Sequence, residues 1–105
     1  MDISFLFDNE STKDINIEIK MENGDKYNYF LKSYVTVGTY NSTRMASFTT
    51  KVTKKAQNII VKVLENNHIF KIHYNPRDGT HITILYFSPK NIHLQVSKKK
   101  PIFYD

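Results

Sequence analysis

The chain has 105 residues, of which 40% are hydrophobic and 24% charged, a composition that predicts one globular domain over residues 1–105. It contains no cysteine, which excludes a disulfide scaffold, thiolate metal sites and a cysteine nucleophile. The net charge of +5 is uneven: residues 1–25 hold seven acids and two lysines, and the remainder holds thirteen basic residues and three acids. This segregation predicts a surface potential that attracts an anionic partner.

The apolar segments are too short for membrane insertion or export. Residues 3–7 form the only apolar run near the N-terminus, and no run approaches the roughly 20 apolar residues of a membrane-spanning helix. We therefore expect a cytoplasmic protein without a membrane span. Asn, Lys, Ile, Tyr and Phe make up nearly half of the chain. Because their codons are rich in A and T, we expect an AT-rich source genome, such as that of a phage or large DNA virus.

The first part of the chain predicts a β-hairpin. Residues 3–7 indicate a short strand, and residues 14–22 alternate between apolar and polar side chains. Asn23-Gly24-Asp25 is typical of a hairpin turn. A three-residue loop there pairs Met21 with Tyr27, so that the apolar residues of both strands share one face.

The apolar residues then change to helical spacing. They are Met45, Phe48, Val52, Ala56, Ile59, Ile60, Val63 and Leu64. This period predicts an amphipathic helix over residues 44–65. Many residues of the segment are β-branched, including residues 59–61, and helix propensity opposes the prediction there.

The last part predicts a three-stranded meander over residues 68–75, 80–88 and 92–97. The turn at 76–79 pairs Tyr74 with Ile82, Ile72 with Ile84 and Phe70 with Tyr86. The turn at 89–91 pairs Tyr86 with Leu94 and Ile84 with Val96. Residues 98–105 are expected to leave the sheet as a mobile tail.

The predicted fold class is therefore α+β: an antiparallel sheet, made of the hairpin and the meander, with one amphipathic helix packed on one face.

The predicted helix carries a basic stripe. At 100° per residue, the cations that fall together on it are Arg44, Lys51, Lys55 and Lys62, with Lys54 to one side. Such a stripe fits a phosphate backbone. The alternative is that the lysine stems cover the rim of the core and keep their charged ends in water.

A second candidate surface lies on the sheet face opposite the helix. It combines Lys71, Phe87 and His93, the residue types that neutralise phosphates and stack on bases. The alternative is that this face is covered by the N-terminal strand, by the tail or by a second copy in a homodimer, because soluble monomers rarely expose large apolar patches.

Several chemistries find no support in the sequence. With only three glycines, the chain has no phosphate-cradling loop. The four histidines lack metal-ligand spacing, so no metal or other cofactor is expected. His73, His81, Arg77 and Tyr74 near one predicted turn are the residue types of a metal-independent ribonuclease.

The leading hypothesis is a non-enzymatic protein that binds DNA or RNA through Arg44, Lys51, Lys54, Lys55 and Lys62, with Lys71, Phe87 and His93 as a second surface. One alternative is a small accessory or inhibitor protein, of phage or viral type, that binds an acidic surface of a larger host protein. The other alternative is a small ribonuclease.

Overall fold

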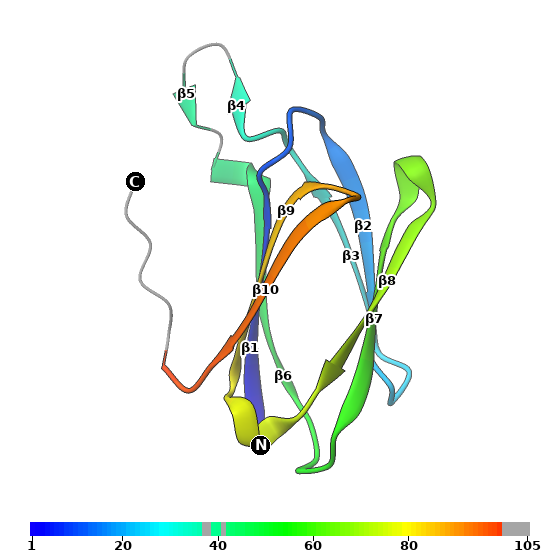
Figure 1. Ribbon diagram of the computed structural model, residues 1–105, viewed down its shortest axis with the longest axis vertical. Helices are drawn as coiled ribbons and strands as arrows, with labels where there is room; N and C mark the ends of the chain where they lie inside the picture. Colours follow the sequence, from blue (N-terminus) through cyan, green and yellow to red (C-terminus); the bar gives the residue numbers. More distant parts are fainter. Residues whose placement is uncertain (37–38, 41, 100–105) are drawn as a thin grey trace.

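The computed structural model describes residues 1–36, 39–40 and 42–99 and is all-β over them (Figure 1). Eight strands form two four-stranded sheets. In spatial order the first sheet contains β10 (Asn91–Ser97), β9 (His81–Ser88), β1 (Asp2–Asn9) and β6 (Met45–Lys51). The second contains β3 (Lys26–Leu31), β2 (Ile15–Lys20), β7 (Gln57–Val63) and β8 (His68–Tyr74).

The remaining regular elements are short. Strands β4 (Val35–Thr36) and β5 (Thr39–Tyr40) form a small separate hairpin. Three 3-10 turns of three residues each follow: η1 (Ser42–Arg44), η2 (Leu64–Asn66) and η3 (Pro76–Asp78). The α+β prediction is wrong, because the described residues contain no other helical segment. None of these turns is long or apolar enough to cross a membrane.

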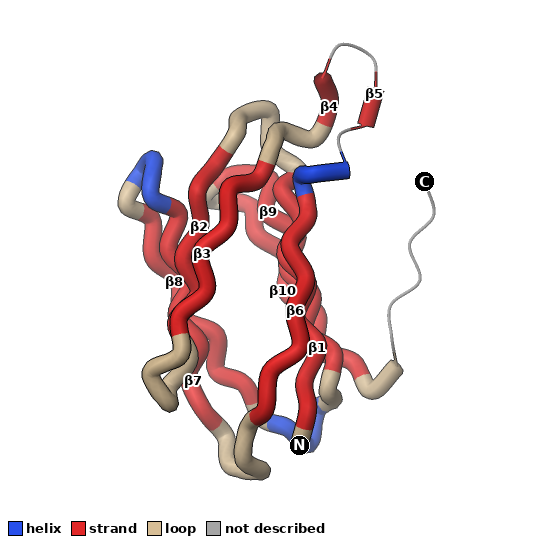
Figure 2. The backbone as a smooth tube through the Cα atoms, turned by 180° about the vertical axis from the view of Figure 1, so that it is seen from behind, coloured by secondary structure: helices blue, strands red, loops and turns tan. Residues whose placement is uncertain are grey.

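The two sheets stack as the layers of a β-sandwich (Figure 2). The chain changes sheet four times, between β1 and β2, β3 and β6, β6 and β7, and β8 and β9. Strand β1 therefore lies inside the first sheet, antiparallel to β6 and parallel to β9. Strand β2 lies inside the second sheet, between β3 and β7. The acidic N-terminal segment thus runs through the middle of both layers.

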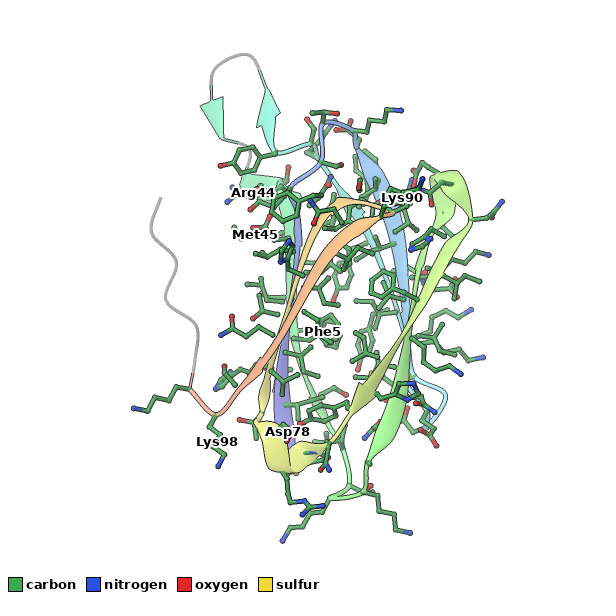
Figure 3. The ribbon with its side chains drawn as sticks, viewed as in Figure 1. Phe5, Arg44, Met45, Asp78, Lys90 and Lys98 are labelled. Carbon is green, nitrogen blue, oxygen red and sulfur yellow. The ribbon has the colours of Figure 1, made fainter. Side chains whose placement is uncertain are left out.

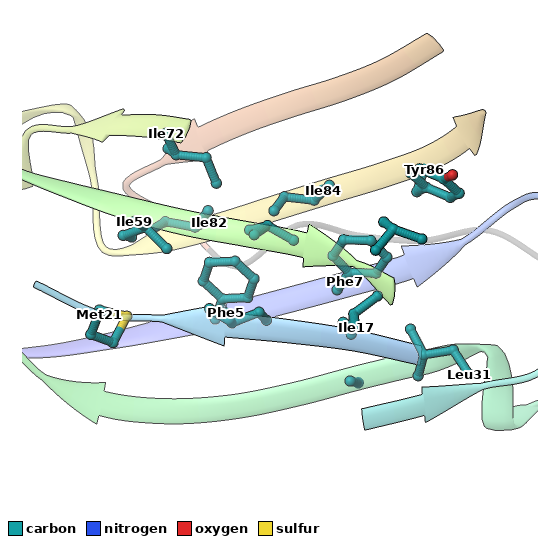
Figure 4. Close-up of a cluster of buried hydrophobic side chains, with 14 of the residues drawn as sticks. Phe5, Phe7, Ile17, Met21, Leu31, Ile59, Ile72, Ile82, Ile84 and Tyr86 are labelled. Atoms are coloured by element: carbon teal, nitrogen blue, oxygen red, sulfur yellow. The ribbon is translucent and has the colours of Figure 1, made fainter. Parts of the chain in front are cut away.

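Alternating apolar side chains from both sheets form the core. Phe5, Phe7, Ile17, Ile59 and Ile84 are each at most 1% exposed (Figure 4). Alternation places every second residue of a strand on the same face, so each strand contributes a row of these side chains. Burial of one such side chain contributes about 1.5–3 kcal/mol.

Residues 44–65 do not form the predicted helix. They form the end of η1, then β6 and β7, which are joined by the loop at residues 52–56. In β7 the buried side chains are Ile59, Val61 and Val63, a strict alternation. The apolar residues of these two strands, when read as one continuous segment across the turn, have the spacing of a helix. The β-branched residues of the segment indicated the correct structure, which is strand.

The first hairpin is confirmed, with its register shifted by two residues. Ile19 faces Tyr27, and a five-residue turn begins at Met21, whose N–H donates to the Asp25 carbonyl at 2.8 Å. A shift by an even number leaves every side chain on its predicted face. The inward and outward sets were therefore correct although the pairs were not.

The predicted meander is only partly correct. Strands β9 and β10 form a hairpin, but its predicted pairs are wrong by two residues: Leu94 faces Ile84 and not Tyr86. Strands β8 and β9 lie in different sheets, so the predicted pairing of Tyr74 with Ile82 does not occur. The connection through η3 passes under the end of β10, where a Cβ added at Gly79 would lie 2.1 Å from the Ser97 carbonyl oxygen. Within the predicted tail at 98–105, residues 100–105 lie outside the described residues.

Candidate nucleic-acid interface

Arg44 is a buried structural cation. Its side chain is only 10% exposed, its Nε donates a hydrogen bond to Asp8 Oδ1 at 3.0 Å, and its guanidinium lies over the ring of Tyr34, 5.2 Å from the centroid. The contact with Asp8 joins the end of η1 to β1. Because a buried ion pair is costly to separate, Arg44 is not available to a phosphate.

The same site contains a second carboxyl group. Burial, together with a hydrogen bond to Asp8 and the charge of Asp8, raises the pKa of the Glu10 carboxyl to about 7, although Arg44 opposes the shift. Asp8 itself is 1% exposed. The buried Asp8 carboxyl, the half-buried Glu10 carboxyl and one guanidinium therefore form a small network at this end of the first sheet, where Figure 3 labels Arg44.

Three of the predicted cations lie at the opposite end of the sandwich. Lys51 ends β6, and Lys54 and Lys55 lie in the following loop, all exposed. Lys51 is paired in the sheet with Asp2, and Lys51 and Lys55 line a hollow of about 310 Å³ together with Glu22. Acids of the N-terminal segment thus lie beside these lysines, so the predicted continuous stripe does not form.

Lys71 does not share a surface with Phe87 and His93. Lys71 lies on β8 in the second sheet, whereas Phe87 and His93 lie on the outer face of the first, with ring centroids 5.4 Å apart in an edge-to-face contact. The prediction of one surface from these three residues is wrong, because it required β8 and β9 to be neighbours.

The outer face of the second sheet instead gathers lysines from all four of its strands. We call it the lysine face, and it contains Lys26 on β3, Lys20 on β2, Lys62 on β7 and Lys71 on β8. All four alternate with the buried residues of their strands, so the pleat directs them away from the core. Across three strand spacings the face is about 14 Å wide.

The charges on the lysine face are largely unbalanced. Glu18 is the acid among its outward residues; it lies 3.7 Å from the ammonium group of Lys26 and directly opposite Lys62 in the sheet. Among the described residues, Lys20, Lys62 and Lys71 have no ion-pair partner. Lys20 lies directly opposite Lys26 in the sheet, an arrangement of like charges that costs stability.

Acids also lie at two borders of this face, each held by a main-chain donor. Glu22 Oε2 accepts a hydrogen bond from the Asn58 N–H at 2.7 Å, and Glu65 Oε1 accepts one from the Asn16 N–H at 2.8 Å. These carboxylates confine the positive region to the centre of the sheet.

Exposed apolar groups lie among the lysines. The fractions exposed are 53% for Phe30, 58% for Ile69, 36% for Ile60 and 42% for Leu64. Phe30 and Leu64 border a hollow of about 150 Å³ that is also lined by Asn16 and Asn28. The ammonium group of Lys32 lies over one face of the Phe30 ring, 5.2 Å from the centroid, which leaves the other face for a base. An aromatic ring, exposed amides and an ammonium group are groups that bind a base and its phosphate.

Sequence reasoning identified two members of the lysine face and missed the other two. Lys62 and Lys71 were predicted to lie on separate surfaces, and Lys20 and Lys26 were not selected. The alternation of residues 14–22 already placed Lys20 on the outward side of its strand, and this was the signal that could have found it.

The residues of the ribonuclease hypothesis do not come together. His73 is on the outer face of the second sheet and His81 on the outer face of the first, so the sandwich lies between them. The Tyr74 hydroxyl is buried and donates to the Gly79 carbonyl at 2.7 Å. Over the described part of the chain, no group of three His, Asp or Glu side chains could hold a metal ion.

A third hollow lies on the outer face of the first sheet. Its volume is about 490 Å³, and the outward residues that line it include Ser4, Leu6, Ser47 and His81. Thr83 also lines it, 4% exposed, with no hydrogen-bond partner for its hydroxyl. The hollow is bordered by hydroxyl groups and carries no lysine, which distinguishes it from the lysine face. No known protein-family model and no curated protein matches this chain.

Proposed function

We propose that the protein binds single-stranded nucleic acid across the lysine face, without catalysing a reaction. The observation that carries this proposal is the gathering of Lys20, Lys26, Lys62 and Lys71 on the outer face of one sheet, which also exposes Phe30. Each lysine that neutralises a phosphate releases a counterion, which makes binding favourable at low salt.

An open sheet face favours a single strand over a duplex. Reading of a duplex groove requires an element that enters it, such as a helix or a two-stranded ribbon. The lysine face is the middle of a four-stranded sheet, and a single strand with unstacked bases can lie across such a surface. Stacking of one base on Phe30 contributes about 1–3 kcal/mol without dependence on its identity.

The test compares two variants with the same change in charge. The first, Lys20→Gln/Lys62→Gln/Lys71→Gln, alters the lysine face, and the second, Lys51→Gln/Lys54→Gln/Lys55→Gln, alters the loop at the far end. Fluorescence anisotropy with a labelled oligothymidylate of about 15 nucleotides measures the affinity. We expect at least a tenfold loss of affinity for the first variant, which corresponds to about 1.4 kcal/mol in total for the three contacts. We expect a loss of less than about threefold for the second variant.

Equal losses would mean that binding follows net charge and not this surface. No binding by the unmodified protein at about 50 mM salt would remove the proposal altogether. A duplex of the same length is the specificity control, and we expect it to bind more weakly.

An acidic protein is the second candidate partner. Ile60, Leu64 and Ile69 are aliphatic, and exposed aliphatic groups with lysines beside them suit a protein surface better than a base. This alternative corresponds to an accessory protein that binds a host factor. It predicts that Ile69→Ser reduces binding to the partner strongly and leaves oligothymidylate binding unchanged.

A further inference from the structure

One side of the sandwich is closed by aromatic stacking between the two sheets. The edge strands β3 and β6 lie there, and the rings of Tyr27 and Phe48 stack with centroids 4.1 Å apart. The Tyr27 hydroxyl also donates to Thr50 Oγ1 at 3.0 Å. The other side of the sandwich has β8 and β10 as its edges.

From Ile92 to Ser97, strand β10 lacks the usual protection of an edge, and the irregularity in its pairing with β9 lies at its beginning, between Asn91 and Ile92. Natural proteins discourage edge-to-edge pairing with charged residues or proline within the edge strand. The edge strands β3, β6 and β8 each contain a lysine, namely Lys26, Lys51 and Lys71. Strand β10 (Asn91–Ser97) contains seven residues with no acid, lysine, arginine or proline.

The sequence of β10 is chemically symmetric about Leu94. Ile92 and Val96 lie on the same face of the strand as Leu94, and both are apolar. His93 and Gln95 lie on the opposite face, and both are polar. The inward side chains Ile92 and Val96 pack against the core, whereas Leu94 between them is 47% exposed. A two-fold axis through Leu94 would pair apolar with apolar and polar with polar side chains, the self-complementarity that an isologous interface requires.

We infer that β10 is a dimerisation edge, at which the β10 strands of two copies pair antiparallel with Leu94 facing Leu94. In this register Ile92 of one copy faces Val96 of the other, and the two first sheets join into one eight-stranded sheet. A register displaced by one residue would place Leu94 opposite Gln95 and mix the two faces, which the pleat excludes.

The interface is small, and its ends repel. A ladder of seven residues buries less than the roughly 1,000 Å² of a stable complex, so the dimer forms at micromolar to millimolar concentration. Lys90 and Lys98 flank the two ends of β10 (Figure 3). In the antiparallel pair, Lys90 of one copy approaches Lys98 of the other, so salt strengthens the dimer by screening this repulsion.

Two antiparallel edge strands of one sheet are related by a two-fold rotation about an axis perpendicular to the sheet. The axis of the proposed dimer therefore has this direction. Both second sheets then lie on the same side of the dimer. The lysine faces of the two copies consequently point in the same direction. The dimer itself does not depend on the proposed function, since β10 and the lysine face belong to different sheets.

Sedimentation velocity over a range of concentrations, at about 50 mM and about 500 mM salt, tests the inference. We expect a monomer–dimer equilibrium that shifts toward dimer at the higher salt. Leu94→Lys is expected to abolish the dimer, and Leu64→Lys, at a leucine of similar exposure in η2, is expected to retain it. A monomer at millimolar concentration under both conditions, or a dimer that Leu94→Lys leaves intact, would overturn the inference.

A gain-of-function variant keeps the test decisive. Lys90→Glu replaces two repulsive contacts per dimer with attractive ones, so we expect about tenfold tighter dimerisation. The salt dependence should also reverse, because salt now screens an attraction. Nucleic-acid binding weakens with salt whereas this dimer strengthens, so the two proposals can fail separately. A Lys90→Glu variant with unchanged dimerisation contradicts the proposed register.

Discussion

The salt dependence of binding gives the sharpest test of the lysine face. For a single strand, the logarithm of the association constant falls with the logarithm of salt concentration by about 0.7 for each phosphate neutralised. The face carries four lysines, one of which is paired with Glu18. Three or four contacts predict a slope of about −2 to −3. Affinity therefore falls about 20- to 50-fold between 50 and 200 mM salt.

Single substitutions measure how much each lysine contributes to this slope. Lys62→Gln or Lys71→Gln each removes one ammonium group that makes no ion pair, so each should reduce the slope by about 0.7. Lys26→Gln should reduce it less, because Glu18 already lies beside that ammonium group. The assay is anisotropy of the labelled oligothymidylate at several salt concentrations, with Lys54→Gln as the control.

Two results would refute this reasoning. A slope near zero for the unmodified protein would show that binding, if observed, does not depend on phosphate contacts. An unchanged slope in both Lys62→Gln and Lys71→Gln, with a reduced slope in Lys54→Gln, would place the contacts on the loop at residues 52–56.

Four further predictions concern stability, measured by urea unfolding. Arg44→Ala should cost about 3–5 kcal/mol, since it leaves the buried Asp8 carboxylate without its cation; a cost below about 1 kcal/mol would contradict a buried pair. The pKa of Glu10 is about 7 in the folded state against its ordinary value of 4.5, so the folded state binds more protons between these pH values. Stability should therefore fall as the pH rises through this range. After discounting for partial exposure this decline is about 1–2 kcal/mol, and Glu10→Gln should remove it. Thr83→Val should stabilise the protein by about 0.5–1.5 kcal/mol, because it removes a buried hydroxyl without a partner, and a destabilised variant would indicate a bound water there. Gly79→Ala should cost about 2–4 kcal/mol through its clash with the Ser97 carbonyl, whereas Gly24→Ala, also at positive φ but in open space, should cost about 1 kcal/mol.

Alternation within strands was the part of the fold that the sequence revealed. It assigned the inward and outward residues of the first hairpin correctly even though Ile19 and not Met21 faces Tyr27. The period of two is a local property, and a register error of two residues does not disturb it. The hairpin between β9 and β10 was found for the same reason.

Strand partners across the molecule could not be predicted in this way. The parallel pairing of Ser4 with His81 joins opposite ends of the chain, and nothing in either segment specifies the other. The false helix over residues 44–65 followed from the same limitation, because the turn at 52–56 has neither glycine nor proline to separate the two strands.

The errors in the predicted site followed from the errors in the predicted fold. Arg44 was selected for its charge, and its burial beside Asp8 depends on β1 lying in the interior of the first sheet. Lys62 and Lys71 lie on neighbouring strands of one sheet, which the α+β arrangement had separated. Charge identified suitable residues, and only the topology decided which of them share a surface.

The parallel pair of β1 and β9 has a consequence for synthesis of the protein. As the ribosome releases the chain, β1 can pair with β6 but has an open edge until β9 emerges, when most of the chain has been made. Contacts between residues so distant in sequence form slowly, and an unpaired edge in the meantime can pair with other chains. A fragment that ends before residue 81 would keep this edge open permanently, so premature termination should yield aggregates and not a smaller folded domain.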